Sequence, residues 1–96
     1  MTVQELNSLR NVLTELFHLK GFHPSWIKFK KVETGVMSGV SVTYKELTTY
    51  LLYDSLSDVW YFLPKLPKSQ PSGKSYIASC YACVKLTDWM ASKTSP

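Results

Sequence analysis

The chain has 96 residues, of which 45% are hydrophobic and 19% charged. These values predict one compact domain, residues 1–96, and argue against a disordered chain. No apolar run reaches the ~20 residues that a membrane helix needs, and the first residues lack the pattern of a secretory signal. We therefore expect a cytoplasmic protein with no membrane partner, whose two cysteines are reduced. The net charge of +4 favours acidic partners.

The first predicted element is a helix over residues 2–20. Thr2 and Glu5 have the T-x-x-E spacing of a capping box, in which each residue satisfies a free amide of the first turn. Apolar residues then recur at helical spacing, namely Leu6, Leu9, Leu13, Leu16 and Phe17. Gly21 follows as the expected left-handed cap that ends the helix.

Residues 25–63 are predicted to form antiparallel strands. Ile27 and Phe29 alternate with lysines, as in a strand that is buried on one face. Gly35 and Gly39 predict a turn region, because glycine is common where a chain reverses direction. After them apolar and polar residues alternate again, which indicates a second strand.

Residues 44–54 fit two interpretations. Thr43 and Glu46 have capping-box spacing, which favours a helix. The segment is also rich in β-branched and aromatic residues, and a polar turn-like stretch at 54–58 follows it, which favours strands. We interpret it as a hairpin with a turn or bulge near Glu46 and Leu47.

The last third of the chain predicts a loop over residues 64–74, with three prolines and three lysines, and a helix over 75–92. Residues 93–96 are expected to fray. On a helical wheel the apolar face contains Tyr76, Ile77, Cys80, Cys83, Val84, Leu86 and Met90. The order of a helix, three or four antiparallel strands and a helix predicts an α+β domain with both helices packed on one face of the sheet.

The stretch Gly73-Lys74-Ser75 resembles the end of a phosphate-binding loop. The complete motif needs a second glycine five residues before Gly73, but that position is Lys68, and Pro71 removes a backbone amide. We therefore expect no nucleotide and no other cofactor. Lys74 remains a candidate for holding one anionic group at the start of a helix.

The cysteines and histidines supply one low-ranked set of metal ligands. Cys80 and Cys83 have C-x-x-C spacing, and His18 and His23 are separated by four residues. A zinc site needs all four to converge, whereas a cysteine pair on an apolar helix face more often belongs to the core. We expect no metal site. We also expect no redox pair, because the cysteines are predicted to lie more than a turn inside the helix.

A basic surface supports nucleic-acid binding as an alternative function. The contact residues would be Lys28, Lys30, Lys65, Lys68 and Lys74. Lysines attract phosphates and aromatic rings stack on bases, so binding would be directed by the backbone or by shape. Double-stranded-RNA-binding domains share the helix–strands–helix order, although the basic run at the start of their second helix is absent here.

Aromatic residues support the leading hypothesis, a small non-enzymatic regulatory protein that contacts another protein or a second copy of itself. The predicted contact residues are Tyr50, Tyr53, Trp60, Tyr61 and Trp89, with the 64–75 loop beside them. The seven acidic residues are scattered singly, and no nucleophile is tied to a base, so we predict no catalytic site. An enzyme or a zinc protein is the second alternative.

Overall fold

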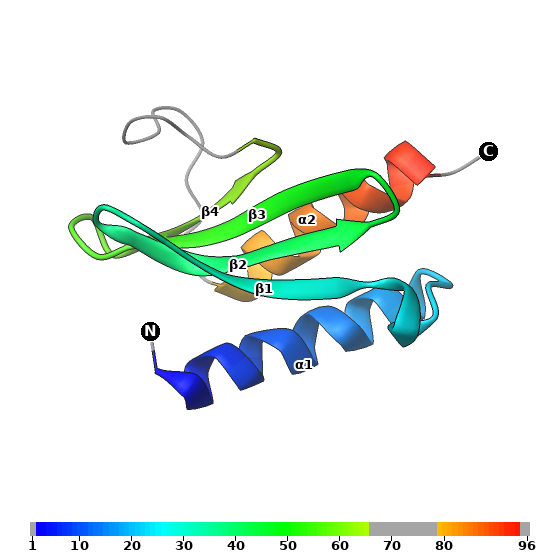
Figure 1. Ribbon diagram of the computed structural model, residues 1–96, viewed down its shortest axis with the longest axis horizontal. Helices are drawn as coiled ribbons and strands as arrows, with labels where there is room; N and C mark the ends of the chain where they lie inside the picture. The colour runs from blue at the N-terminus through cyan, green and yellow to red at the C-terminus, as the bar shows by residue number, and fades with distance from the viewer. Residues whose placement is uncertain (1, 66–78, 95–96) are drawn as a thin grey trace.

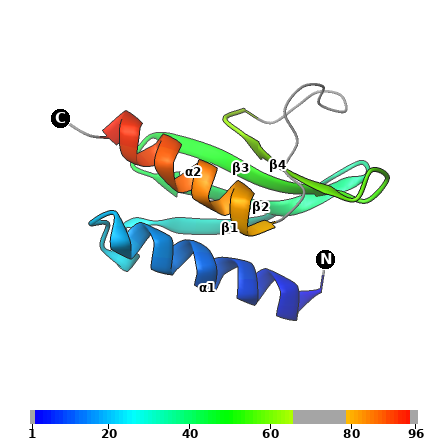
Figure 2. The same cartoon turned by 180° about the vertical axis from the view of Figure 1, so that it is seen from behind.

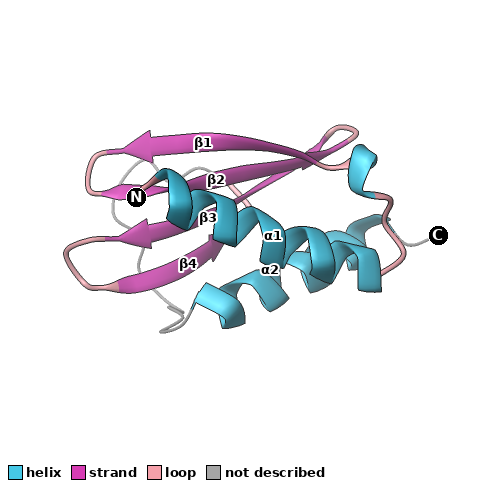
Figure 3. Ribbon diagram, turned by 90° about the horizontal axis from the view of Figure 1, so that it is seen from below, coloured by secondary structure: helices cyan, strands magenta, loops and turns pink. Residues whose placement is uncertain are grey.

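The computed structural model describes residues 2–65 and 79–94 of the chain (Figure 1). The elements in order are α1 (Val3–Leu19), the 3-10 helix η1 (Pro24–Trp26), β1 (Lys28–Thr34), β2 (Met37–Tyr44), β3 (Leu47–Asp54), β4 (Val59–Leu63) and α2 (Ser79–Thr94). The four strands form one antiparallel sheet in the order β1-β2-β3-β4. Both helices lie on the same face of this sheet (Figures 1 and 3). The α+β prediction is confirmed.

Helix α1 begins and ends as its sequence predicts. The backbone amide of Glu5 donates a 3.1 Å hydrogen bond to Thr2 Oγ1, which caps the first turn. Gly21 takes φ +91°, a conformation that glycine adopts at low cost, just after the last turn. The apolar stripe faces the sheet, with Leu9, Leu13 and Phe17 buried.

Helix α2 differs from its prediction at its C-terminal end and on its apolar face. Residues 75–78 lie outside the described residues, so the predicted start of the helix stays a prediction. At its other end the helix continues through Thr94, two residues beyond the predicted end at residue 92. Thr94 Oγ1 donates to the carbonyl of Met90. Cys80 and Val84 are exposed, contrary to the wheel. The residues that α2 does bury are Ala82, Cys83, Leu86, Thr87 and Met90.

The wheel failed because its apolar arc was placed too far round the helix, toward Val84. Residues in an α-helix are about 100° apart, so Val84 lies about 100° round from Cys83 and points away from the sheet. Leu86 and Met90 stay within about 60° of Cys83 and are fully buried. Ala82 lies about 100° from Cys83 on the side opposite to Val84 and is also fully buried, so the buried stripe is shifted toward Ala82.

The hairpin over residues 44–54 is confirmed. Strand β2 ends at Tyr44 and β3 begins at Leu47, with Lys45 at φ +56° in the turn between them. The next turn begins at Asp54, whose carboxylate accepts hydrogen bonds from the amides of Leu56 and Ser57. These polar contacts fix where β3 ends and β4 begins.

Two boundaries near the first hairpin differ from the prediction. Residues 24–26 form η1 instead of the start of a strand, with Pro24 in its first turn and His23 Nδ1 accepting from the Ser25 amide at 3.2 Å. Gly39 lies inside β2, not in a turn. A Cβ at Gly39 would overlap the Leu51 carbonyl, so this glycine permits close approach of two strands.

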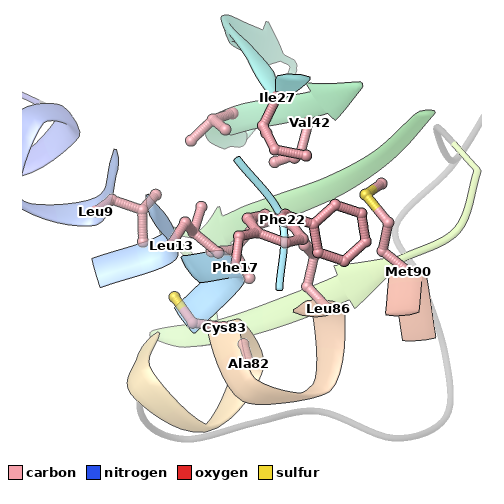
Figure 4. Packing of buried hydrophobic residues seen from close by; sticks show 12 residues of the cluster. Leu9, Leu13, Phe17, Phe22, Ile27, Val42, Ala82, Cys83, Leu86 and Met90 are labelled. Atoms are coloured by element: carbon pink, nitrogen blue, oxygen red, sulfur yellow. The ribbon is translucent and has the colours of Figure 1, made fainter. Parts of the chain in front are cut away.

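The core lies between the helix pair and the sheet. Helix α2 packs on β3 and β4, while Arg10 of α1 lies 5.5 Å from the centre of the Phe29 ring on β1. The helices run side by side in the same direction (Figure 2). Lys20, which follows α1, forms a 2.8 Å ion pair with Asp88 of α2. Figure 4 shows the buried side chains from both helices meeting those of the sheet.

Candidate functional site

A cavity of about 550 Å³ opens between the N-terminal halves of α1 and α2. Its lining among the described residues consists of Thr2, Gln4, Glu5, Ser8, Leu9, Val12, Trp60, Cys80 and Cys83. We call it the helix-end cavity. Its volume falls within the range of small-ligand and side-chain pockets in proteins. It opens to solvent, and another depression, lined by residues that include Phe22, Trp26 and Tyr44, has a smaller volume of about 240 Å³.

The helix-end cavity is lined by both apolar and polar groups. Leu9, Val12 and Trp60 supply apolar surface, and Val12 is 42% exposed. The first turns of α1 supply hydroxyl, amide and carboxylate groups, among them Ser8 and Glu5. This arrangement, an apolar wall beside a few polar groups, is typical of sites that bind by burial and orient by hydrogen bonding.

Trp60 is held in the cavity wall by its neighbours on the sheet. The register pairs it with Tyr53, and the two rings lie 5.4 Å apart. The Tyr53 hydroxyl donates a 2.6 Å hydrogen bond to Asp58 Oδ1. That hydrogen bond, with smaller effects of desolvation and of carboxylates including Glu5, raises the pKa of Tyr53. Tyr53 therefore stays protonated at neutral pH and continues to donate to Asp58.

The two cysteines in the wall differ in exposure. Cys80 is exposed, whereas Cys83 is 1% exposed and both are free thiols. The Cys83 sulfur points from α2 toward α1, near Leu13 (Figure 4). Burial of the thiol raises the pKa of Cys83 to about 12, with a smaller contribution from the nearby Cys80. Cys83 is thus a neutral core thiol at physiological pH, and Cys80 is the accessible one.

The structure distributes the predicted aromatic contact residues over two faces. Tyr53 and Trp60 are partners on the helix side of the sheet, whereas Tyr50 and Tyr61 project from the opposite face. Trp89 packs on Phe62, with ring centres 5.7 Å apart. These five residues therefore do not form one continuous surface. The part of the predicted contact loop over residues 66–75 lies outside the described residues.

The predicted phosphate-binding lysines are placed only in part. Lys28 and Lys30 are exposed on β1 and project from the face away from the helices, since their partners Thr43 and Ser41 alternate with the core residue Val42. Lys65 is exposed just after β4. Lys68 and Lys74, including the candidate anion position at Lys74, lie outside the described residues.

The four candidate metal ligands do not come together. His18 lies in the last turn of α1, far along the helix from the end that meets Cys80. His23 caps η1, where its Nδ1 is 2.7 Å from Ser25 Oγ. Over residues 2–65 and 79–94, no group of three or more His, Cys, Asp or Glu side chains is arranged to hold a metal ion.

Sequence reasoning did not find the α1 side of the cavity. Val12 is an apolar residue that does not belong to the apolar stripe of Leu9 and Leu13. An apolar side chain outside the core-facing stripe was the feature of the sequence that could have indicated a binding surface on α1. In the sequence, Glu5 stands out only as part of the capping motif with Thr2. Which residues face each other across α1 and α2 depends on how the helices pack, and the sequence does not specify that.

No protein-family model, curated protein or solved structure matches this chain. In the part of the chain that the structure describes, none of the helices combines the length and apolar character needed to cross a membrane.

Proposed function

We propose that this chain is a small non-enzymatic binding protein that acts through protein contacts, and that its partner inserts an apolar side chain into the helix-end cavity. The observation that carries the proposal is the open cavity of about 550 Å³ with Leu9, Val12 and Trp60 in its wall. Filling such a cavity removes apolar surface of both partners from water. Each Å² of apolar surface buried in this way contributes about 25 cal/mol of favourable free energy.

The surface around the cavity supports a protein partner. Val12 is 42% exposed, and Tyr81 and Val84 on the outer side of α2 are 51% and 40% exposed. Val84 follows Cys80 by one helical turn, so apolar surface continues along α2 from the cavity. A pocket for an anchor residue surrounded by partly apolar surface is the usual form of an energetic centre in a protein interface.

The charge at the rim narrows the chemistry of the partner. Glu5 is the charged residue among the described lining residues. A partner segment that places Lys or Arg beside its apolar anchor would therefore be favoured over one with an acidic neighbour. We expect the preferred motif to be an apolar residue flanked by a basic one.

Selection from a phage-displayed library of random peptides would test this proposal, with the full chain as target. We expect enriched peptides to share an apolar anchor next to a basic residue. Val12→Lys should weaken their binding at least about tenfold, because it places a charge in the pocket mouth. Val3→Lys is the matched control, since Val3 is on the same helix, is 72% exposed and does not line the cavity.

Two outcomes would reject the helix-end cavity as the contact site. One is a set of peptides whose affinity is unchanged by Val12→Lys in a protein with a normal circular dichroism spectrum. The other is equal loss of binding for Val12→Lys and Val3→Lys, which would indicate a general effect of charge.

Nucleic-acid binding is the second candidate, and it is favoured by one relationship on the opposite face of the sheet. The register aligns Lys30, Ser41 and Tyr50 in one row across three strands. Neighbouring strands are about 4.8 Å apart, so Lys30 and Tyr50 are separated by about 10 Å. That spacing allows a lysine to attract a phosphate while the tyrosine ring stacks on a base of the same strand.

Fluorescence anisotropy with a labelled single-stranded oligonucleotide at increasing salt would test this second function. If it is correct, affinity falls steeply with salt, and Lys30→Gln lowers the slope by about 0.7 for the phosphate contact that is lost. Lys31→Gln removes the same charge from the other face of β1, where Lys31 pairs with Glu33 at 3.2 Å. Equal effects of the two substitutions, or binding that does not respond to salt, would contradict a specific role for this face.

A further inference from the structure

The wall of the helix-end cavity contains a pair of free thiols with unequal access to solvent. Cys80 is exposed and Cys83 is 1% exposed, and both line the same cavity. The expectation that both thiols lie in the core is wrong for Cys80, whereas Cys83 is a core residue. How far the pair lies from the start of the helix depends on residues outside the described part of the chain. Cys80 lies in the first described turn of α2, which is described from Ser79.

Helix geometry brings the two cysteines within reach of a disulfide. Residues three apart in an α-helix have Cα atoms about 5 Å from each other. Disulfides span Cα separations of about 4.4–6.8 Å, so the backbone spacing is suitable. The Cβ atoms of such residues are about 5–6 Å apart, compared with about 3.5–4.5 Å in a disulfide. Closure therefore requires the turn at residues 80–83 to distort.

We propose that Cys80 and Cys83 form a redox-sensitive dithiol that is oxidised by low-molecular-weight disulfides such as glutathione disulfide. The Cys80 thiolate attacks the disulfide, forms a mixed disulfide and releases one thiol. The Cys83 thiolate, after losing its proton to solvent, then attacks the Cys80 sulfur and releases the second thiol. In total the two cysteines lose two electrons and two protons, and one glutathione disulfide becomes two molecules of glutathione.

Because the two cysteines differ in exposure, each carries out a different step of the reaction. Only Cys80 is accessible to a small disulfide in solution, so it makes the first attack. Cys83 is protected from outside reagents but lies three residues away on the same helix, so it meets the mixed disulfide at high effective concentration. Burial raises the pKa of Cys83 and thus slows, but does not prevent, the second attack.

The strain of closure makes this pair a reversible switch. Disulfides that deviate from preferred geometry are more easily reduced than structural ones. Oxidation would also shift Cys83, which packs in the core and lines the cavity, and so would change the shape of the binding site. The dithiol reaction itself requires no partner protein, so its test is independent of the proposed function.

The experiment uses the full, reduced chain in buffers with graded ratios of glutathione disulfide to glutathione. Samples are quenched with acid and alkylated, and intact masses and peptide maps identify the products. For the wild type we expect an internal Cys80–Cys83 disulfide, two hydrogens lighter and without bound glutathione. Cys83→Ala should stop at one glutathione on Cys80. Cys80→Ala should take up glutathione at least about tenfold more slowly, because Cys83 reacts only after local opening.

Three results would overturn the proposal. The wild type could stop at the same one-glutathione product as Cys83→Ala. It could form a disulfide between the Cys80 residues of two chains as its main product. Cys80→Ala could react as fast as the wild type. Circular dichroism and thermal melting establish that each variant is folded, and Cys83→Ser replaces Cys83→Ala if the latter is not. The wild-type product alone decides whether the internal disulfide forms.

Discussion

A side chain at Gly39 would collide with the backbone carbonyl of Leu51 on the neighbouring strand. The obstacle is main chain in the middle of the sheet, so it cannot move aside as a flexible side chain would. We expect Gly39→Ala to lower the free energy of unfolding by at least about 3 kcal/mol, the upper range for overpacking, in urea denaturation.

Gly35→Ala serves as the control for Gly39→Ala. Gly35 has φ +58° and nothing within 4 Å of its missing Cβ, so the cost there is only that of a left-handed backbone, about 1–2 kcal/mol. A Gly39→Ala protein as stable as Gly35→Ala would show that the strands separate easily at this point.

Leu13 and Leu19 offer a matched pair of substitutions on one helix. Leu13 is fully buried between α1 and the sheet, whereas Leu19 is 75% exposed. Leu13→Ala should cost about 2–5 kcal/mol by removing core contacts and leaving a cavity. Leu19→Ala should change stability by no more than about 0.5 kcal/mol. Chemical denaturation measures both, and similar costs at the two positions would contradict the packing of α1 on the sheet.

The buried thiol of Cys83 makes stability depend on alkaline pH. Its pKa is raised from 9.0 to about 12 in the folded chain, so the folded state holds the proton more tightly than the unfolded state. The stabilisation from this difference is fully present below pH 9 and is lost as pH rises toward 12. Between these values the free energy of unfolding should fall by up to about 1.4 kcal/mol per pH unit.

Cys83→Ala isolates this contribution, because other groups also titrate above pH 9. The difference in unfolding free energy between wild type and variant should shrink as pH rises from 9 to 12. A difference that stays constant across this range would mean that Cys83 is not protected from ionisation in the folded chain.

The ion pair between Lys20 and Asp88 is expected to contribute little. Its 2.8 Å distance is short, but the side chains are 43% and 50% exposed, so water and salt screen the attraction. In a double-mutant cycle with Lys20→Met and Asp88→Asn, the coupling should be below about 1 kcal/mol and should decrease with added salt. A larger coupling that salt leaves unchanged would indicate that this pair positions the helices.

Much of the fold could be predicted because its signals are local. The cap at Thr2, the apolar stripe through Leu13 and Phe17, and Gly21 define α1 from neighbouring residues alone. The turns at the ends of β3 were also predictable, since polar residues there satisfy backbone groups in sequence-adjacent contacts. The prediction for Gly39 was wrong, because the residue type alone does not distinguish a glycine in a turn from a glycine that lets a neighbouring strand approach closely.

The candidate site was far less predictable. The aromatic residues of β3 and β4 are close together in the sequence, but side chains alternate between the two faces of a sheet, so Tyr53 and Tyr50 project in opposite directions. The helix-end cavity joins Glu5 and Val12 to Trp60 and Cys80, which are separated by about half the chain or more. No local pattern relates them.

The sequence by itself determined the two helices, the antiparallel strands between them and the apolar stripe of the first helix, because capping, turn and periodicity signals act over a few residues. Only the tertiary structure decided that the helices run side by side in one direction, that Cys80 is exposed while Cys83 is buried, and that a cavity opens between them. These features depend on how side chains from distant segments pack together, and that packing is settled by the whole core at once.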